Sequence, residues 1–202
     1  MEMPIPAIAS LAATLTVALM CISFALAVVA HAQRRELDPV EMPFSAYLSG
    51  ISRRVGLACY AALGSGIIVF AVATGLLAHT SVLVVTATGL YLASGTFLAI
   101  AAATARADLP LSHENPRTRR WHRRSSFLAF LCSIIAVALH AAAWRGSVFA
   151  NVWPLPAYFA AALAVLFVGL WFAPLRIKGA VQKLLIAGIV GWFSWAALLM
   201  RS

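Results

Sequence analysis

Histidines are the residues of this sequence whose type and spacing could do chemistry. The chain has five of them. His31 and His79 end two long apolar stretches, His140 lies about one turn inside another, and His113 and His122 fall in a basic segment. Imidazole nitrogens are axial ligands of haem iron. If the apolar stretches cross a membrane, His79 with His140 and His31 with His122 would each bring two imidazoles into one leaflet, which makes haem b a candidate cofactor.

The sequence contains one further histidine alignment but no motif of a known class of catalytic site. His122 and His140 would share one face of a continuous helix, because the interval between them equals five turns. However, histidines at the ends of spans commonly serve as interfacial polar groups. There is no His-x-x-x-His pair and no acid within an apolar stretch to suggest a zinc hydrolase, and no phosphate loop, nucleophile elbow or Ser-x-x-Lys pair. We therefore assign no catalytic residue and no metal site.

A cluster of arginines is the second candidate site. Its members are Arg117, Arg119, Arg120, Arg123 and Arg124. Basic clusters beside a membrane attract anionic headgroups by about 1 kcal/mol per residue. We predict either that this cluster binds anionic lipid headgroups or a protein partner, or that it only determines the topology.

A shorter segment nearer the N-terminus shows helical periodicity. Phe44, Tyr47, Leu48 and Ile51 recur at the spacing that gives a helix one apolar face. Such a helix commonly lies in the plane of the membrane interface. We predict a short surface helix here, with Tyr47 as a lipid or partner contact.

The elements that must position these residues are membrane spans. Hydrophobic residues make up 63% of the chain and charged residues only 10%, against about 45–50% and about 25% in soluble domains. A helix needs about 20 apolar residues to cross the bilayer, and windows of that length recur six times. The predicted spans are 6–30, 55–78, 81–105, 126–144, 154–173 and 181–200. We predict an all-α membrane protein, a single six-helix transmembrane domain over residues 1–202.

The distribution of positive charge predicts the orientation. If the loops alternate between two sides, one side holds 13 of the 15 Lys and Arg residues, and the other holds Arg145 and Arg201. Lys and Arg concentrate in cytoplasmic loops, so we predict both termini outside, the long basic loops inside, and a bacterial inner membrane as the location. Because the net charge of +9 sits between apolar spans, we expect no nucleic-acid partner. Trp144 and Trp153 flank an outer loop and are predicted to anchor that interface.

Small residues predict where the helices pack. Helices in lipid associate through close approach of small side chains, and two stripes of residues at four-residue spacing offer this. They are Ala58, Ala62 and Gly66 in the second span and Ala87, Tyr91, Gly95, Ala99 and Ala103 in the third. We interpret them as seams within one chain, with a homodimer face as the alternative.

Three stretches resemble the domain of unknown function 998 family, uncharacterised multi-pass membrane proteins of bacteria and archaea. They are Pro43 to Gly50, Asp108 to Pro110 with Arg117 to His122, and Gly179 to Lys183. The likeness spans most of the chain. It implies six helices with no established activity, and it would place a functional surface on the cytoplasmic loops around Ser45, Tyr47, Asp108 and His122.

Three functions are consistent with these observations. The first is a non-catalytic accessory subunit or lipid-interacting helical bundle, whose partners would be membrane lipids, another membrane subunit or a second copy. The second is a b-type cytochrome that uses the paired histidines. The third is a facilitator for a small neutral solute, which needs a hydroxyl-lined path but no titratable group. The absence of acids from the spans disfavours charge-coupled transport.

Overall fold

Six long helices account for most of the chain. The computed structural model describes residues 5–48, 50–77, 81–105, 116–145, 150–151 and 153–201. Each helix is long and apolar enough to cross a membrane, which confirms the prediction of a six-helix, all-α, multi-pass membrane protein. The helices are α1 (Ile5–Gln33), α2 (Arg53–Leu77), α3 (Val82–Thr104), α4 (Pro116–Trp144), α5 (Leu155–Phe172) and α6 (Leu175–Leu199).

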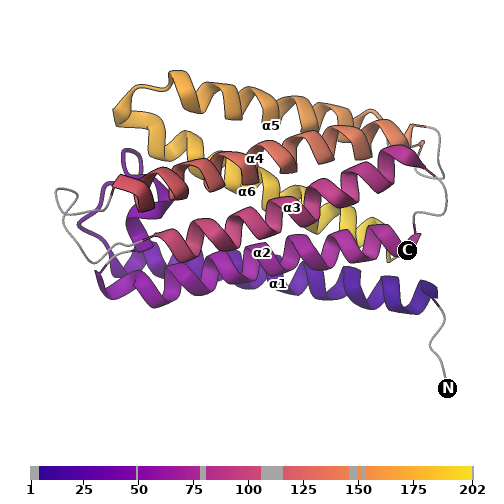
Figure 1. Cartoon of the computed structure of the whole chain (residues 1–202), viewed down its shortest axis with the longest axis horizontal. Helices are drawn as coiled ribbons and strands as arrows, with labels where there is room; N and C mark the ends of the chain where they lie inside the picture. The colour runs from indigo at the N-terminus through magenta and orange to yellow at the C-terminus, as the bar shows by residue number, and fades with distance from the viewer. Residues whose placement is uncertain are drawn as a thin grey trace.

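The helices run alternately up and down along one axis (Figure 1). Each helix contacts the next one in sequence, and α6 returns to contact α1. We call the end where α1, α3 and α5 finish the basic end, and the opposite end the terminal end. All described Lys and Arg residues except Arg145 and Arg201 belong to the basic end.

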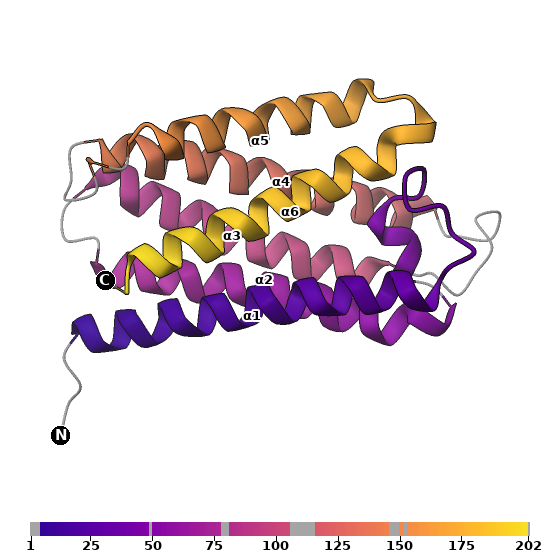
Figure 2. The same cartoon turned by 180° about the vertical axis from the view of Figure 1, so that it is seen from behind.

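Helix α6 crosses the bundle obliquely. Figure 2 shows it close to α5 at the basic end and close to α1 at the terminal end. Consequently α6 and α1 diverge toward the basic end. The chain between α1 and α2 occupies part of the space between them, as described below.

Glycines allow the closest helix contacts. A Cβ on Gly95 of α3 would lie 2.9 Å from the carbonyl oxygen of Gly64 in α2, and one on Gly66 would lie 2.6 Å from Met20 Cε in α1. Both close contacts lie within one chain. Ala62, Ala87 and Tyr91 of the same stripes are also buried inside the bundle. The predicted seams are therefore intramolecular over these residues. Ala58, Ala99 and Ala103 of the same stripes are exposed instead, because the buried face of each helix drifts relative to a strict four-residue repeat.

Two helices begin well before the spans predicted for them. α4 begins at Pro116 rather than at residue 126, and α6 begins at Leu175 rather than at residue 181. The arginine cluster therefore lies on a helix and not in a loop. The placement of the cluster in a loop was wrong because Arg and Lys are good helix formers that let a helix continue beyond the predicted span.

The segment after α1 packs into the bundle. It contains two 3-10 helices, η1 (Phe44–Leu48) and η2 (Gly50–Ser52), and Gly50 has the positive φ of 60° that lets the chain turn between them. Phe44, Tyr47 and Leu48 are at most 4% exposed, so the predicted position flat on the membrane surface is wrong for them. Their apolar face is covered by protein instead of lipid, while Ile51 is 75% exposed.

Candidate functional site

An open cavity at the basic end is the most prominent candidate site. It has a volume of about 580 Å³ and lies where α6 diverges from α1, with α2 behind it and the η1 segment at the basic end. We call it the α1–α6 cavity. Its wall includes Phe24 and Ala27 from α1, Tyr60 from α2, and Ala187 and Val190 from α6. Ligand pockets in proteins commonly have volumes of about 300–1,000 Å³.

The mouth of the cavity faces the lipid side of the bundle. Phe24 and Leu184 line it and are each 59% exposed, and Val28 is 55% exposed. These residues lie on opposite sides of the mouth, on α1 and α6. An apolar molecule dissolved in the bilayer can therefore enter sideways, without passing through water.

The cavity is elongated along α1 and α6. On α1 its wall runs from Ser23 to His31, and on α6 from Ala180 to Val190. At 1.5 Å per residue these stretches are about 12 and about 15 Å long. Half of a hydrocarbon core is about 15 Å thick, so the length of the cavity is similar to that of one lipid chain.

The deep end of the cavity offers no unpaired polar group. Ser23 Oγ donates a hydrogen bond to the Cys59 carbonyl oxygen at 3.2 Å, and Cys59 Sγ donates to the Ser23 carbonyl oxygen at 3.2 Å. The described chain contains no buried side-chain nitrogen or oxygen that lacks a partner. This end of the cavity therefore suits a hydrocarbon chain.

Lys183 brings positive charge to the basic end of the cavity. Its Nζ donates to the carbonyl oxygens of Met42, at 2.9 Å, and of Pro39, and it lies 5.1 Å from the centre of the Tyr47 ring. An ammonium has three donors, so one remains for a ligand. Lys183 is only partly buried, and it lines the cavity together with His31.

The His31 ring is held by a hydrogen bond and by neighbouring aromatic rings. Its Nδ1 is 2.7 Å from the Ala27 carbonyl oxygen and therefore carries the proton of that hydrogen bond, which leaves Nε2 as the second ring nitrogen. The ring stacks on Tyr47 with 4.1 Å between centroids. Burial raises the pKa of the Tyr47 phenol, so Tyr47 stays neutral and supports the His31 ring inside the protein. This position does not offer the Tyr47 side chain to lipid.

The first loop reaches the cavity because it is attached to α6. The Ala180 N–H donates to the Val40 carbonyl oxygen at 2.8 Å, and the Phe44 N–H donates to Gln182 Oε1 at 2.9 Å. Gly179 leaves room for this contact, since a Cβ there would lie 2.6 Å from the Met42 carbonyl carbon. We call these contacts, with those of Lys183, the loop–α6 latch. Residues of the segment between α1 and α2 and residues at the start of α6 thus meet in space, although they are far apart in the sequence.

His31 and His122, one of the two predicted histidine pairs, lie at separate places. His122 and His140 both face α3 from α4, as the five-turn spacing predicts, with His122 Nδ1 2.8 Å from the Ala101 carbonyl oxygen and His140 Nδ1 3.4 Å from Tyr91 Oη. His31 lines the α1–α6 cavity, whereas His122 lines a different one. His79 and His113 lie outside the described residues. Haem ligation by these histidines stays a prediction that the geometry does not favour.

The terminal half of the bundle is filled with aromatic rings. Trp192 Nε1 donates to Tyr91 Oη at 3.3 Å, and the Phe70 and Phe193 rings pack edge-on with 4.9 Å between centroids. Trp144 is 4% exposed and joins this cluster beside His140, so its predicted role as an interfacial anchor is wrong. Tight ring packing here does not favour a solute path through the centre of the bundle.

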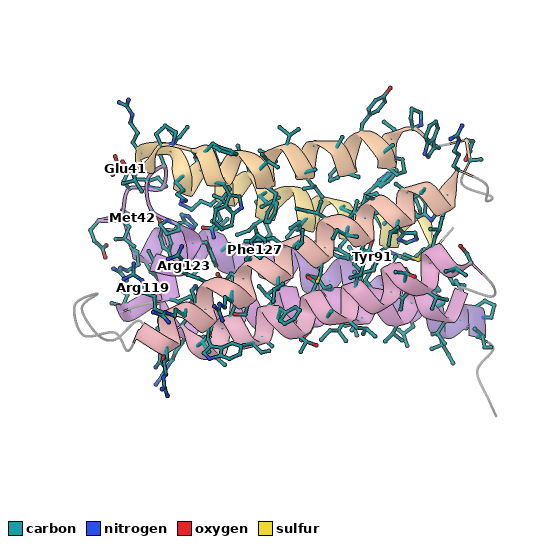
Figure 3. The ribbon with its side chains drawn as sticks, turned by 45° about the horizontal axis from the view of Figure 1, so that its top comes forward. Glu41, Met42, Tyr91, Arg119, Arg123 and Phe127 are labelled. Carbon is teal, nitrogen blue, oxygen red and sulfur yellow. The ribbon has the colours of Figure 1, made fainter. Side chains whose placement is uncertain are left out.

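The arginine cluster lies on the exposed basic end of α4. Arg117, Arg119, Arg120, Arg123 and Arg124 are all exposed. Arg119, Arg123 and Phe127 follow one another along the helix (Figure 3), as residues four apart must. The cluster therefore meets the interface where anionic headgroups would lie, provided that the six helices cross a bilayer.

Sequence reasoning did not find the α1–α6 cavity. Its wall consists mostly of Ala, Val, Leu and Phe residues that any span contains, and the cavity lies where the tilted α6 leaves α1. Lys183 was the one available signal, but it was counted among the basic residues of the loop before the last span and was given no separate role. No family model matches the chain, and comparison with curated proteins and with solved structures likewise yields no match.

Proposed function

We propose that this protein is a non-catalytic, lipid-interacting membrane bundle that binds one amphiphile in the α1–α6 cavity. The observation that carries the proposal is the laterally open cavity of about 580 Å³, apolar along its depth and cationic at one end. The protein acts as a carrier or accessory subunit for that amphiphile. No arrangement among the described residues favours a covalent step, and none holds three potential metal ligands together.

The ligand is an amphiphile with an apolar chain and an anionic group. Lipid tails are as apolar as the wall of the cavity, so transfer of a chain from bilayer to cavity gains little hydrophobic free energy. Selectivity must come from shape and from the polar end. Lys183 and His31 stand at that end, and the remaining Lys183 donor can bind a carboxylate or phosphate oxygen.

The basic end is proposed to face the cytoplasm of a bacterial cell. The segregation of Lys and Arg to this end supports that orientation, because cytoplasmic loops carry the excess of these residues. Both termini would then lie outside. Membership of the 998 family and association with another membrane subunit or a second copy are part of the same proposal.

Native mass spectrometry of protein purified gently from its own membranes tests the proposed function. We expect a fraction of the 21.5 kDa chain to carry one amphiphile. Ala27→Phe, which fills the wall of the cavity, should abolish that mass increment. Ala25→Phe is the matched control, because Ala25 is an exposed residue of the same helix outside the cavity.

The possible outcomes either support, overturn or replace the proposal that the cavity binds an amphiphile. Loss of the increment in Ala27→Phe alone supports the cavity as the site. An increment that persists in Ala27→Phe, or a chain that never carries an amphiphile, overturns the proposal. A haem-sized increment with visible absorption would replace it with the cytochrome hypothesis.

A further inference from the structure

A second candidate site lies on the other side of α6, beside the basic end of α4. Two smaller cavities, of about 200 and about 330 Å³, share Arg123, Phe127 and Trp171 in their walls. Because they share these walls, they form one groove between α4, the end of α5 and the start of α6. We call it the α4–α6 groove.

One part of the groove is cationic and polar. Arg123 lines both cavities, Arg120 and Arg124 line the larger, and Lys178 of α6 lines the smaller together with Gln182. No acidic side chain is among the described residues that line either cavity. Lys178 also lies in the first turn of α6, where the helix dipole adds partial positive charge.

The other part of the groove is aromatic. The Phe127 ring packs against Phe167, with 5.4 Å between centroids, and against Trp171, with 5.5 Å. Trp171 is 55% exposed, at the level where α4 changes from arginine-rich to apolar. Tryptophan is enriched at this depth of a membrane because its ring is amphipathic.

We propose that the α4–α6 groove binds the headgroup of an anionic phospholipid. Arg123 and Lys178 hold the phosphate, and Phe127 and Trp171 contact the glycerol backbone and the first carbons of the chains. Charge complementarity selects the anion. The aromatic wall selects a lipid over a soluble phosphate, since a soluble anion would leave these rings without a ligand contact.

This site is distinct from the α1–α6 cavity. Among the described residues, Phe130 alone lines both. The groove keeps the lipid near the basic end whether or not the cavity holds an amphiphile. The two proposals are therefore tested by different variants: Ala27→Phe changes the cavity, whereas Arg123→Gln and Lys178→Gln change the groove.

Lipid titration of the delipidated full-length protein, followed by native mass spectrometry, tests the proposal. The probes are phosphatidylglycerol and phosphatidylcholine with identical acyl chains. We expect phosphatidylglycerol to bind more tightly, and we expect Arg123→Gln and Lys178→Gln each to weaken it about tenfold, because each removes a charge-assisted hydrogen bond to the phosphate. Far-UV circular dichroism of each variant checks that the bundle is folded.

Arg119→Gln is the matched control. Arg119 is exposed on the same helix, one turn before Arg123, and lines neither cavity. It should leave phosphatidylglycerol affinity within twofold of the unmodified protein. An equal loss in Arg119→Gln would show diffuse surface attraction, and no loss in Arg123→Gln would show that the groove is not the site. Displacement of the lipid by glycerol phosphate would show that the aromatic side chains do not contribute to binding. That result would overturn the assignment of the groove to a phospholipid.

Discussion

Gly179 offers the sharpest test of how the first loop is held. A Cβ at this position of α6 would lie 2.6 Å from the Met42 carbonyl carbon and 2.8 Å from the Glu41 carbonyl carbon. Both atoms are backbone, so no side-chain rotation relieves the overlap. The loop must retreat by about 1 Å to restore ordinary contact.

The energetic cost of Gly179→Ala follows from the loop–α6 latch. Displacing the loop weakens the hydrogen bonds from Ala180 N–H to Val40 and from Lys183 Nζ to Met42, each worth about 1 kcal/mol net. Overlap that is not relieved costs about 1–3 kcal/mol. Alanine regains about 1 kcal/mol of helix propensity. We expect Gly179→Ala to lower the free energy of unfolding by about 1–3 kcal/mol.

SDS titration in mixed micelles would measure this free energy, and limited trypsin digestion at the exposed Arg35 would report on the loop directly. Gly169→Ala is the matched control, because a Cβ at Gly169 of α5 meets nothing within 4 Å. It should be neutral or stabilising by up to about 1 kcal/mol. If Gly179→Ala matched this control in stability and in the rate of trypsin cleavage, the latch would not hold the loop and the reasoning would be refuted.

Three further predictions follow from the bundle itself. Gly95→Ala should lower the free energy of unfolding by about 1–3 kcal/mol because it pushes α3 away from a backbone carbonyl of α2. Gly89→Ala is the control, because its added Cβ meets open space and should not lower the free energy of unfolding. SDS titration of both variants measures the difference. Tyr91→Phe should lower the free energy of unfolding by about 1–3 kcal/mol, because the buried hydroxyl that is hydrogen-bonded to His140 is lost. Tyr158→Phe changes a residue that is 68% exposed and should have no effect in the same assay. A C-terminal alkaline phosphatase fusion should be active, since that enzyme matures only outside the cytoplasm, and an inactive fusion beside an active C-terminal fluorescent protein would reverse the proposed orientation.

The sequence predicts the membrane helices well because hydrophobic length is a strong constraint. A charge-free window of about 20 residues has few alternatives to a transmembrane helix, and all six windows became helices. Helix ends were predicted less well, since α4 and α6 continue through their basic residues. Charge indicates where the bilayer stops, but the backbone hydrogen bonding of a helix can continue beyond that point.

Burial of the first loop shows a second limit. The spacing of Phe44, Tyr47 and Leu48 predicted one apolar face, and the structure has that face. Spacing alone does not say whether lipid or protein covers it. The answer depends on Gly56 and Gly179, where the absence of a Cβ lets the loop approach α2 and α6, and such long-range pairing leaves no local pattern in one sequence.

The tilt of α6 connects the loop, the cavity and the groove. Because α6 leaves α1 toward the basic end, a space opens there that the η1 segment fills in part and the α1–α6 cavity occupies in part. Because the same tilt brings α6 toward α5, Lys178 comes to line a groove with Arg123 and Trp171. Ala27→Phe, which fills the cavity from α1 at a residue outside the lining of the groove, should therefore abolish amphiphile retention in the cavity and leave phosphatidylglycerol binding in the groove unchanged. A single variant that affects one site and spares the other would show that α6 separates two independent lipid sites.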